Sequence, residues 1–152
     1  MTTLQDVVTR TVDTLRKHLD DPNSRSNRGN FVYDDLPKTS ASTPRVSVFS
    51  IDSPFDYPYI NADDQVQTGM IQVSVFWDNE VFFEDYETHN GNAWAQYQLG
   101  QFVDEVMDAI DNNKDSEILD DKILYMEKMD ETETSEESRL QKNIIYETKI
   151  VR

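Results

Sequence analysis

The sequence contains no cysteine, which excludes disulfide bonds and metal sites built on thiolates. Histidine is nearly as scarce: only His18 and His89 are present, and we expect both to face solvent. No apolar run approaches the roughly 20 residues of a membrane span. The opening residues, MTTLQD, lack the basic and apolar regions of a secretory signal. These absences favour a protein made in the cytoplasm, without a membrane partner, and used there or built into a particle.

Motifs of catalysis are also missing. The four glycines are isolated from one another, so no glycine-rich loop is available to hold a phosphate, and there is no nucleophile elbow. Acidic pairs such as Asp20-Asp21 and Asp63-Asp64 are frequent, but 30 acidic residues produce such pairs by chance. The stretch from Asp104 to Asp115 lacks the central glycine of an EF-hand loop. We therefore expect no enzyme activity, no metal and no cofactor, with a carboxylate-based hydrolase as an alternative.

Basic residues are few, since 14 lysines and arginines stand against 30 acidic residues, a formal net charge of -16. Such a charge repels nucleic acid and strains the compact state by self-repulsion. The acids are spread along the whole chain, aspartate outnumbers glutamate, and lysine is scarce. Molar salt shortens the Debye length to about 3 Å, so this composition favours a protein adapted to high salt.

What is present fits one α+β domain over residues 1–152. Residues 3–20 and 92–112 have the periodicity of amphipathic helices, and Thr3 with Asp6 forms a capping start for the first. Residues 45–51, 69–77, 122–129 and 139–151 have the pattern of strands. The order α-β-β-α-β-β predicts a four-stranded, mainly antiparallel sheet with both helices packed on one face. The expected apolar stripes of the helices are Leu4, Val8, Val12, Leu15 and Leu19, and Ala95, Leu99, Phe102, Val106 and Ala109 or Ile110.

Two polar segments are candidate contact regions. The long loop at residues 22–44 carries Arg25 and Arg28, and within it residues 31–33 are expected to form a short strand or to dock onto the core. The acidic stretch at residues 130–138 is expected to be an exposed hairpin tip or flexible loop. Its acidic residues are Asp130, Glu131, Glu133, Glu136 and Glu137.

Aromatic residues on irregular segments form a second candidate region. They either fold back onto the core or fill a subunit interface, where tyrosine and phenylalanine are enriched. The edges of a small sheet offer a further route to assembly, because an unpaired edge can accept another chain. The aromatic candidates are Phe55, Tyr57, Tyr59, Phe82 and Phe83.

The organisation resembles the tail terminator proteins of long-tailed viruses. An amphipathic N-terminal helix leads through a polar loop into the strand Arg45 to Ile51 and then the strand Gly69 to Trp77. A helix follows Asn90-Gly91, and the chain closes with a hairpin whose last strand reads RLQKNIIYETKI. The resemblance covers most of the chain and lies in the order of elements. The long loop and the extreme acidity depart from it.

This resemblance, together with the acidity, implies a virion protein of a tailed virus that infects a halophilic archaeon. The family implies a ring, usually of six subunits, that caps the tail tube and joins it to the neck and head. Its expected partners are therefore other copies of itself, the tail tube protein and neck or head–tail connector proteins, with DNA passing through the lumen. The alternatives are a neck stopper or head–tail adaptor of the same particle, and a halophilic module that binds a basic protein.

Overall fold

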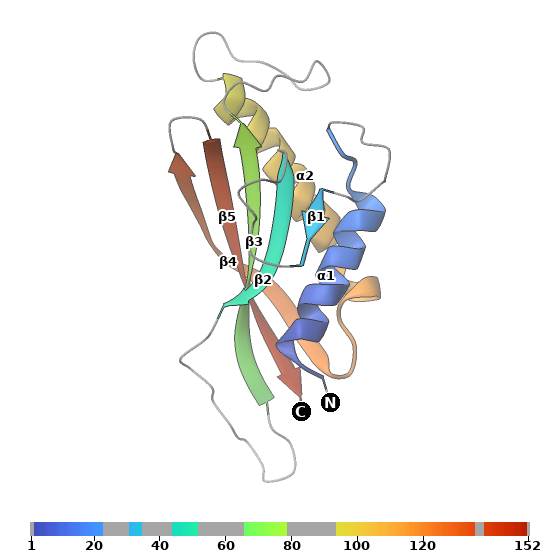
Figure 1. Cartoon of the computed structure of the whole chain (residues 1–152). Helices are drawn as coiled ribbons and strands as arrows, with labels where there is room; N and C mark the ends of the chain where they lie inside the picture. Colours follow the sequence, from blue (N-terminus) through green and yellow to red (C-terminus); the bar gives the residue numbers. More distant parts are fainter. Residues whose placement is uncertain are drawn as a thin grey trace.

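The protein is an α+β structure with two helices and a five-stranded mixed sheet (Figure 1). The computed structural model describes residues 2–22, 31–34, 44–51, 66–78, 94–135 and 139–151. The helices are α1 (Leu4–His18) and α2 (Trp94–Glu117). The strands are β1 (Val32–Tyr33), β2 (Arg45–Ile51), β3 (Val66–Asp78), β4 (Ile123–Ser135) and β5 (Arg139–Val151).

The sheet has the strand order β1-β2-β3-β5-β4, and only the β1–β2 pair is parallel. The expectation of four strands is therefore wrong by one, because residues 31–33 contribute β1. Two residues are too short a run to show a strand period. β1 is held by its surroundings: the backbone N–H of Val46 donates to the carbonyl of Phe31 over 2.7 Å. The buried Phe31 ring also lies 6.3 Å from the ring of Phe102 in α2.

The antiparallel ladder between β3 and β5 forms the centre of the sheet. It pairs thirteen residues of each strand, from Val66 with Val151 to Asp78 with Arg139. Alternate side chains of a strand point to opposite faces, so each strand contributes one buried series toward the helices. The strand alternation expected for β3 and β5 is confirmed by the burial of Ile71, Val73, Val75 and Trp77, and of Leu140, Ile144, Tyr146 and Ile150.

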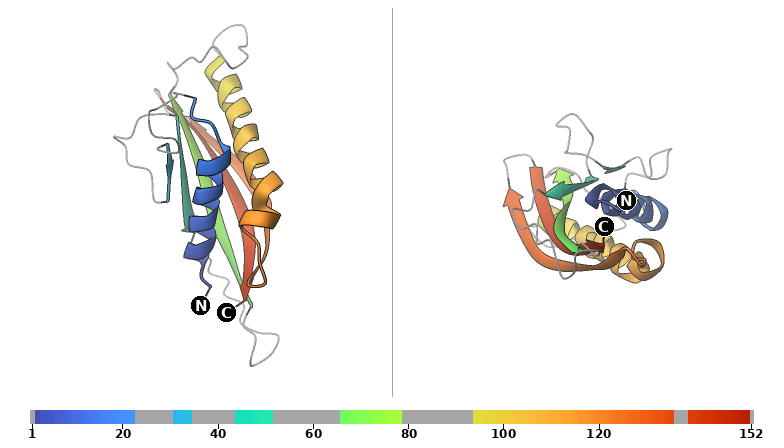
Figure 2. Two further views of the ribbon diagram at one scale, coloured as in Figure 1. Left: turned by 90° about the vertical axis from the view of Figure 1, so that its right-hand side faces the viewer. Right: turned by 90° about the horizontal axis from the view of Figure 1, so that it is seen from below.

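Both helices cover that buried face and lie side by side in front of the strands in the left view of Figure 2. The capping box of Thr3 and Asp6 is confirmed at the start of α1. The apolar stripes expected on both helices pack into the core, with Leu4 at its margin. The expected end of the second helix at residue 112 is wrong, because α2 continues to Glu117. Asn113 stays helical by donating its side-chain N–H to the carbonyl of Ala109 over 2.8 Å.

α1 is tied to the turn that follows α2. The guanidinium of Arg10 donates to the carbonyl of Ile118 over 2.9 Å and to the carboxylate of Asp120 over 2.7 Å. The other oxygen of Asp120 accepts the backbone N–H groups of Ile123 and Lys122, each over 2.7 Å. The Ile123 N–H, with Arg10 and the Lys122 N–H, lowers the pKa of Asp120 from 3.8 to about 2. One carboxylate thus fixes both the start of β4 and the position of α1.

Gly69 allows the first turn of α1 to lie directly on β3, because a Cβ there would stand 2.4 Å from Leu4 Cδ2. Gly69→Ala must displace the Leu4 side chain, so it should lower the free energy of unfolding by about 1 kcal/mol, as overpacking does. Gly100, exposed in α2 with open space around it, is the matched control. Gly100→Ala should raise stability by up to about 1 kcal/mol. Urea unfolding checks both, and equal effects at the two sites would contradict the close approach.

Asp120 should contribute stability that depends on pH. Its pKa in the folded state is about 2, below the ordinary 3.8, so the contribution is complete above pH 4 and is lost as the pH falls toward 2. At neutral pH, Asp120→Asn should cost about 1 kcal/mol, since partial exposure screens the interaction with Arg10.

Urea unfolding of the wild type and of Asp120→Asn across this pH range measures the difference in stability. The exposed neighbour Asp121 provides the control variant, Asp121→Asn. A difference between wild type and Asp120→Asn that stays constant from pH 7 to the acid limit would contradict the assigned role.

Candidate assembly surfaces

Most of the contact residues expected from the sequence lie outside the described residues. This applies to the two loop arginines, to the five loop aromatics and to two of the loop acids, and their roles stay predictions. They are Arg25, Arg28, Phe55, Tyr57, Tyr59, Phe82, Phe83, Glu136 and Glu137.

The other three acids of the expected acidic loop lie in a strand. Asp130, Glu131 and Glu133 belong to β4, which runs to Ser135, so the loop boundary at residue 130 is wrong. The β4–β5 ladder continues through the acidic stretch as far as Ser135 opposite Leu140. Lysines offset the charge, because Lys128 pairs with Glu131 at 3.0 Å and Lys142 lies 3.8 Å from Glu131 and 3.9 Å from Glu133. Alternating threonines, which favour strands, also support the extended backbone.

The face of the sheet that points away from the helices is nearly neutral. The strand registers place four acidic residues on it, Asp78, Glu127, Asp130 and Glu147, and three basic residues, Arg45, Arg139 and Lys149. In the whole chain acidic residues outnumber basic ones 30 to 14. The acidic and basic residues on the helix-free face thus nearly balance, unlike those of the chain as a whole.

Apolar side chains occupy the part of this face around Gln72. Gln72 lies between Phe49 of β2 and Ile145 of β5, and in the next row Ile51 lies opposite Met70. All five are half-buried. Both helices lie on the opposite face of the sheet, and on this face Arg45 and Phe76 are already buried within the chain, at 0% and 2% exposure. The arrangement of an apolar centre with polar surroundings matches the anatomy of protein–protein interfaces.

A hydrogen-bonded polar cluster borders the apolar centre and centres on Asn143. The side-chain carbonyl of Asn143 accepts from Gln141 over 2.7 Å, from Ser74 over 2.8 Å and from Gln72 over 3.1 Å. Its amide group donates to the hydroxyl of Thr132 over 3.3 Å. The cluster joins β3, β5 and β4, so it holds the helix-free face in one arrangement. Satisfied polar groups of this kind are compatible with burial against a partner.

The solvent side of α2 has the opposite character. It carries five carboxylates: Asp104, Glu105, Asp108, Asp111 and Asp115. All five side chains are exposed. Lys114, 3.8 Å from Asp111, is the basic residue among them. The strongly acidic side of the domain and its nearly neutral side thus lie on opposite faces, the one outside the helices and the other outside the sheet.

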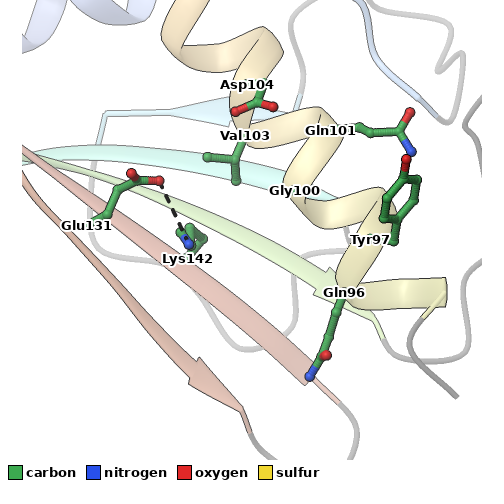
Figure 3. Close-up of a pocket in the computed structure, with 8 residues that line it drawn as sticks. All are labelled: Gln96, Tyr97, Gly100, Gln101, Val103, Asp104, Glu131 and Lys142. Carbon is green, nitrogen blue, oxygen red and sulfur yellow. Dashed lines mark ion pairs between the residues drawn. The ribbon is translucent and has the colours of Figure 1, made fainter. Parts of the chain in front are cut away.

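A groove of about 380 Å³ lies between α2 and the β4–β5 hairpin (Figure 3). Tyr97, Gly100 and Asp104 line its helix side, while the Glu131–Lys142 ion pair lines its strand side. Its lining offers hydrogen-bonding groups and one pair of opposite charges, without a nucleophile beside a base. Among the described residues no group of three or more histidine, aspartate or glutamate side chains is arranged to hold a metal ion.

The two edges of the sheet differ. At the β1 edge, Arg16 donates to the backbone carbonyl of Val32 over 2.8 Å and so satisfies an acceptor that another strand could otherwise use. At the β4 edge, Lys114 covers the carbonyl of Met126 over 3.0 Å, but no described strand pairs with the outer side of β4.

Two irregularities of β4 expose apolar side chains. The register skips Leu124 and Met129, and these two residues are 47% and 52% exposed. A β-bulge at a sheet edge redirects a side chain. Together with Tyr97, they are the exposed large hydrophobic residues of the described chain.

The sequence interpretation did not identify the apolar residues of the helix-free face or the exposed residues of β4. The available signal was that β2 and β5 carry apolar residues on both faces in a fold with a single helix layer. For β4 the signal was the loss of alternation at Leu124 and Met129.

No protein-family model matches the chain, and no curated protein sequence matches it. None of the helices in the described ranges combines the length and the apolarity required to cross a bilayer.

Removing the acceptor at the centre of the polar cluster should destabilise the domain. Asn143→Ala removes the acceptor of the buried Ser74 hydroxyl, which then keeps only the hydrogen bond donated by Gln72 over 2.8 Å, so we expect a loss of about 1 kcal/mol in the free energy of unfolding. Thr132→Ala, which removes only an exposed contact of the same cluster, should cost less than about 0.5 kcal/mol. Urea unfolding of the two variants tests this order, and equal losses would show that the cluster does not act through Asn143.

Proposed function

We propose that this protein is a structural subunit that assembles with copies of itself into a ring at the head–tail joint of a tailed virus. The observation that carries the proposal is the nearly neutral, apolar-centred helix-free face on a chain whose net charge is -16. Two copies approaching through any strongly acidic surface bring carboxylates together, which is costly. The helix-free face is the side on which copies meet without that repulsion.

The role at the head–tail joint is the one implied by the resemblance to tail terminator proteins. The charge distribution of the domain supports this role. A joint of this kind must let DNA pass without holding it. The carboxylates along α2, from Asp104 to Asp115, repel phosphate wherever they line the path of DNA. The partners proposed with this role are the tail tube protein and the neck or connector proteins, and the proposed location is the tail–neck junction of the virion.

High salt is part of the proposed setting. Self-repulsion of a chain this acidic extends over about 10 Å at 0.1 M salt but over only about 3 Å at 1 M. Assembly of subunits with a charge of -16 should therefore become stronger as the salt concentration rises.

Light scattering coupled to size-exclusion chromatography tests the proposal in low and in molar potassium chloride. We expect a multiple of the 17.7 kDa chain mass in molar salt, and electron microscopy should show closed rings with a central opening. Phe49→Glu on the helix-free face should weaken assembly by about 2 kcal/mol, or about thirtyfold in the dissociation constant.

Thr9→Glu is the matched control, because it adds the same charge at an exposed position of α1. It should leave the assembled mass unchanged. A wild-type protein that stays at the mass of one chain at every salt concentration, with its fold intact, would contradict the proposed function.

A further inference from the structure

The groove between α2 and the β4–β5 hairpin, named here the Gly100 groove, is open over a position without a side chain. Gly100 lies on α2 between Tyr97 and Asp104, with Glu131 and Lys142 on the opposite side of the groove (Figure 3). A Cβ at Gly100 would meet no atom within 4 Å. Tyr97, Gly100 and Asp104 are exposed, so this groove of about 380 Å³ opens to solvent.

Gly100 is unfavourable for α2 taken by itself. It lies inside a helix of 24 residues, where only proline is less favourable than glycine. At Gly69 the side chain of Leu4 occupies the place of a Cβ, whereas over Gly100 the described chain leaves open space. Packing within the chain therefore does not require a glycine at residue 100. The open space has room for a group that another molecule supplies.

The charges that line the groove favour a cation as this group. On the strand side, Lys142 lies 3.8 Å from Glu131 and 3.9 Å from Glu133, and Lys128 pairs with Glu131 at 3.0 Å, so the charges there offset one another. On the helix side, Asp104 forms no ion pair within the part of the chain that the structure describes. A positive group that enters the groove therefore meets a carboxylate that is still unpaired.

The shape of the groove favours arginine among the cationic side chains. Tyr97 and Asp104 stand about 10 Å apart along the helix axis, at a rise of 1.5 Å per residue, with Gly100 between them. An arginine has an apolar stem that can lie over Gly100 beside the ring of Tyr97, which is 40% exposed. Its guanidinium then reaches Asp104, and guanidinium groups pair with carboxylates through two parallel hydrogen bonds.

We propose that the Gly100 groove binds an arginine side chain presented by another protein. The site lies on the helix side of the sheet, so it goes beyond the proposed self-assembly and does not depend on it. An arginine also offsets part of the net charge of -16, which favours encounter with a partner whose surface is basic.

Titration with N-acetyl-L-arginine amide, followed by NMR of the isotope-labelled protein, tests the site. The potassium chloride concentration is the lowest at which circular dichroism shows the intact fold. The backbone amide signals of Gly100 and its neighbours should shift along a saturable curve, with a dissociation constant on the order of 1 mM. N-acetyl-L-citrulline amide has nearly the same shape without the charge, and it should bind at least about tenfold more weakly.

Three variants locate the binding. Gly100→Gln fills the open space with a good helix former, so the fold is retained and binding should weaken at least about tenfold. Asp104→Asn removes the carboxylate and should weaken binding about tenfold. Asp108→Asn is the matched control, because it removes the same charge one turn further along α2, outside the groove. It should change the dissociation constant less than about twofold.

Four results would overturn the arginine site. They are equal binding by the wild type and Gly100→Gln, equal binding of the arginine and citrulline amides, equal losses in Asp104→Asn and Asp108→Asn, and shifts that rise without saturation. The last two indicate general attraction to an acidic surface. None of them bears on ring formation, because the assembled mass is measured separately by light scattering.

Discussion

The structure depends on one apolar layer between two helices and a single face of the sheet. The β3–β5 ladder supplies the middle of this layer, where Trp77 packs with its ring 5.6 Å from that of Phe102 in α2. A chain with only 37% hydrophobic residues and a charge of -16 has little apolar surface to spare against self-repulsion. Under the proposed self-assembly, the apolar residues of the helix-free face, which lie outside this layer, add to the buried surface of each copy.

The segregation of charge follows from the same constraint. Carboxylates collect along the solvent side of α2, where water and salt stabilise them, and the acidic end of β4 is held by Lys128 and Lys142. On the helix-free face acidic and basic residues nearly balance. There Glu147 accepts a hydrogen bond from the hydroxyl of Tyr125, and the ammonium of Lys149 lies 5.4 Å from the centre of the Tyr125 ring. A domain organised in this way has one side suited to water and another suited to protein.

Much of the fold could be predicted from the sequence because long elements with a strong period report directly on burial. The capping box of α1, the stripes of both helices and the last strand at residues 139–151 follow from local spacing. β1 could not be predicted, since two residues carry no period and tertiary contacts hold them in place. The extension of β4 was hidden by its acids, whose charge is offset by Lys142, a residue distant in sequence.

The helix-free face was the hardest part to predict, because the residues that form it come from four strands and meet only through the registers of the sheet. Methionine oxidation measures the accessibility of the helix-free face most directly, because Met70 lies on this face. The half-buried Met107 of α2 serves as an internal reference. Burial of the face between copies predicts that hydroxyl-radical oxidation of Met70 falls as the protein is concentrated in molar salt, while that of Met107 stays constant. Equal oxidation of Met70 in dilute and assembled protein would contradict the burial.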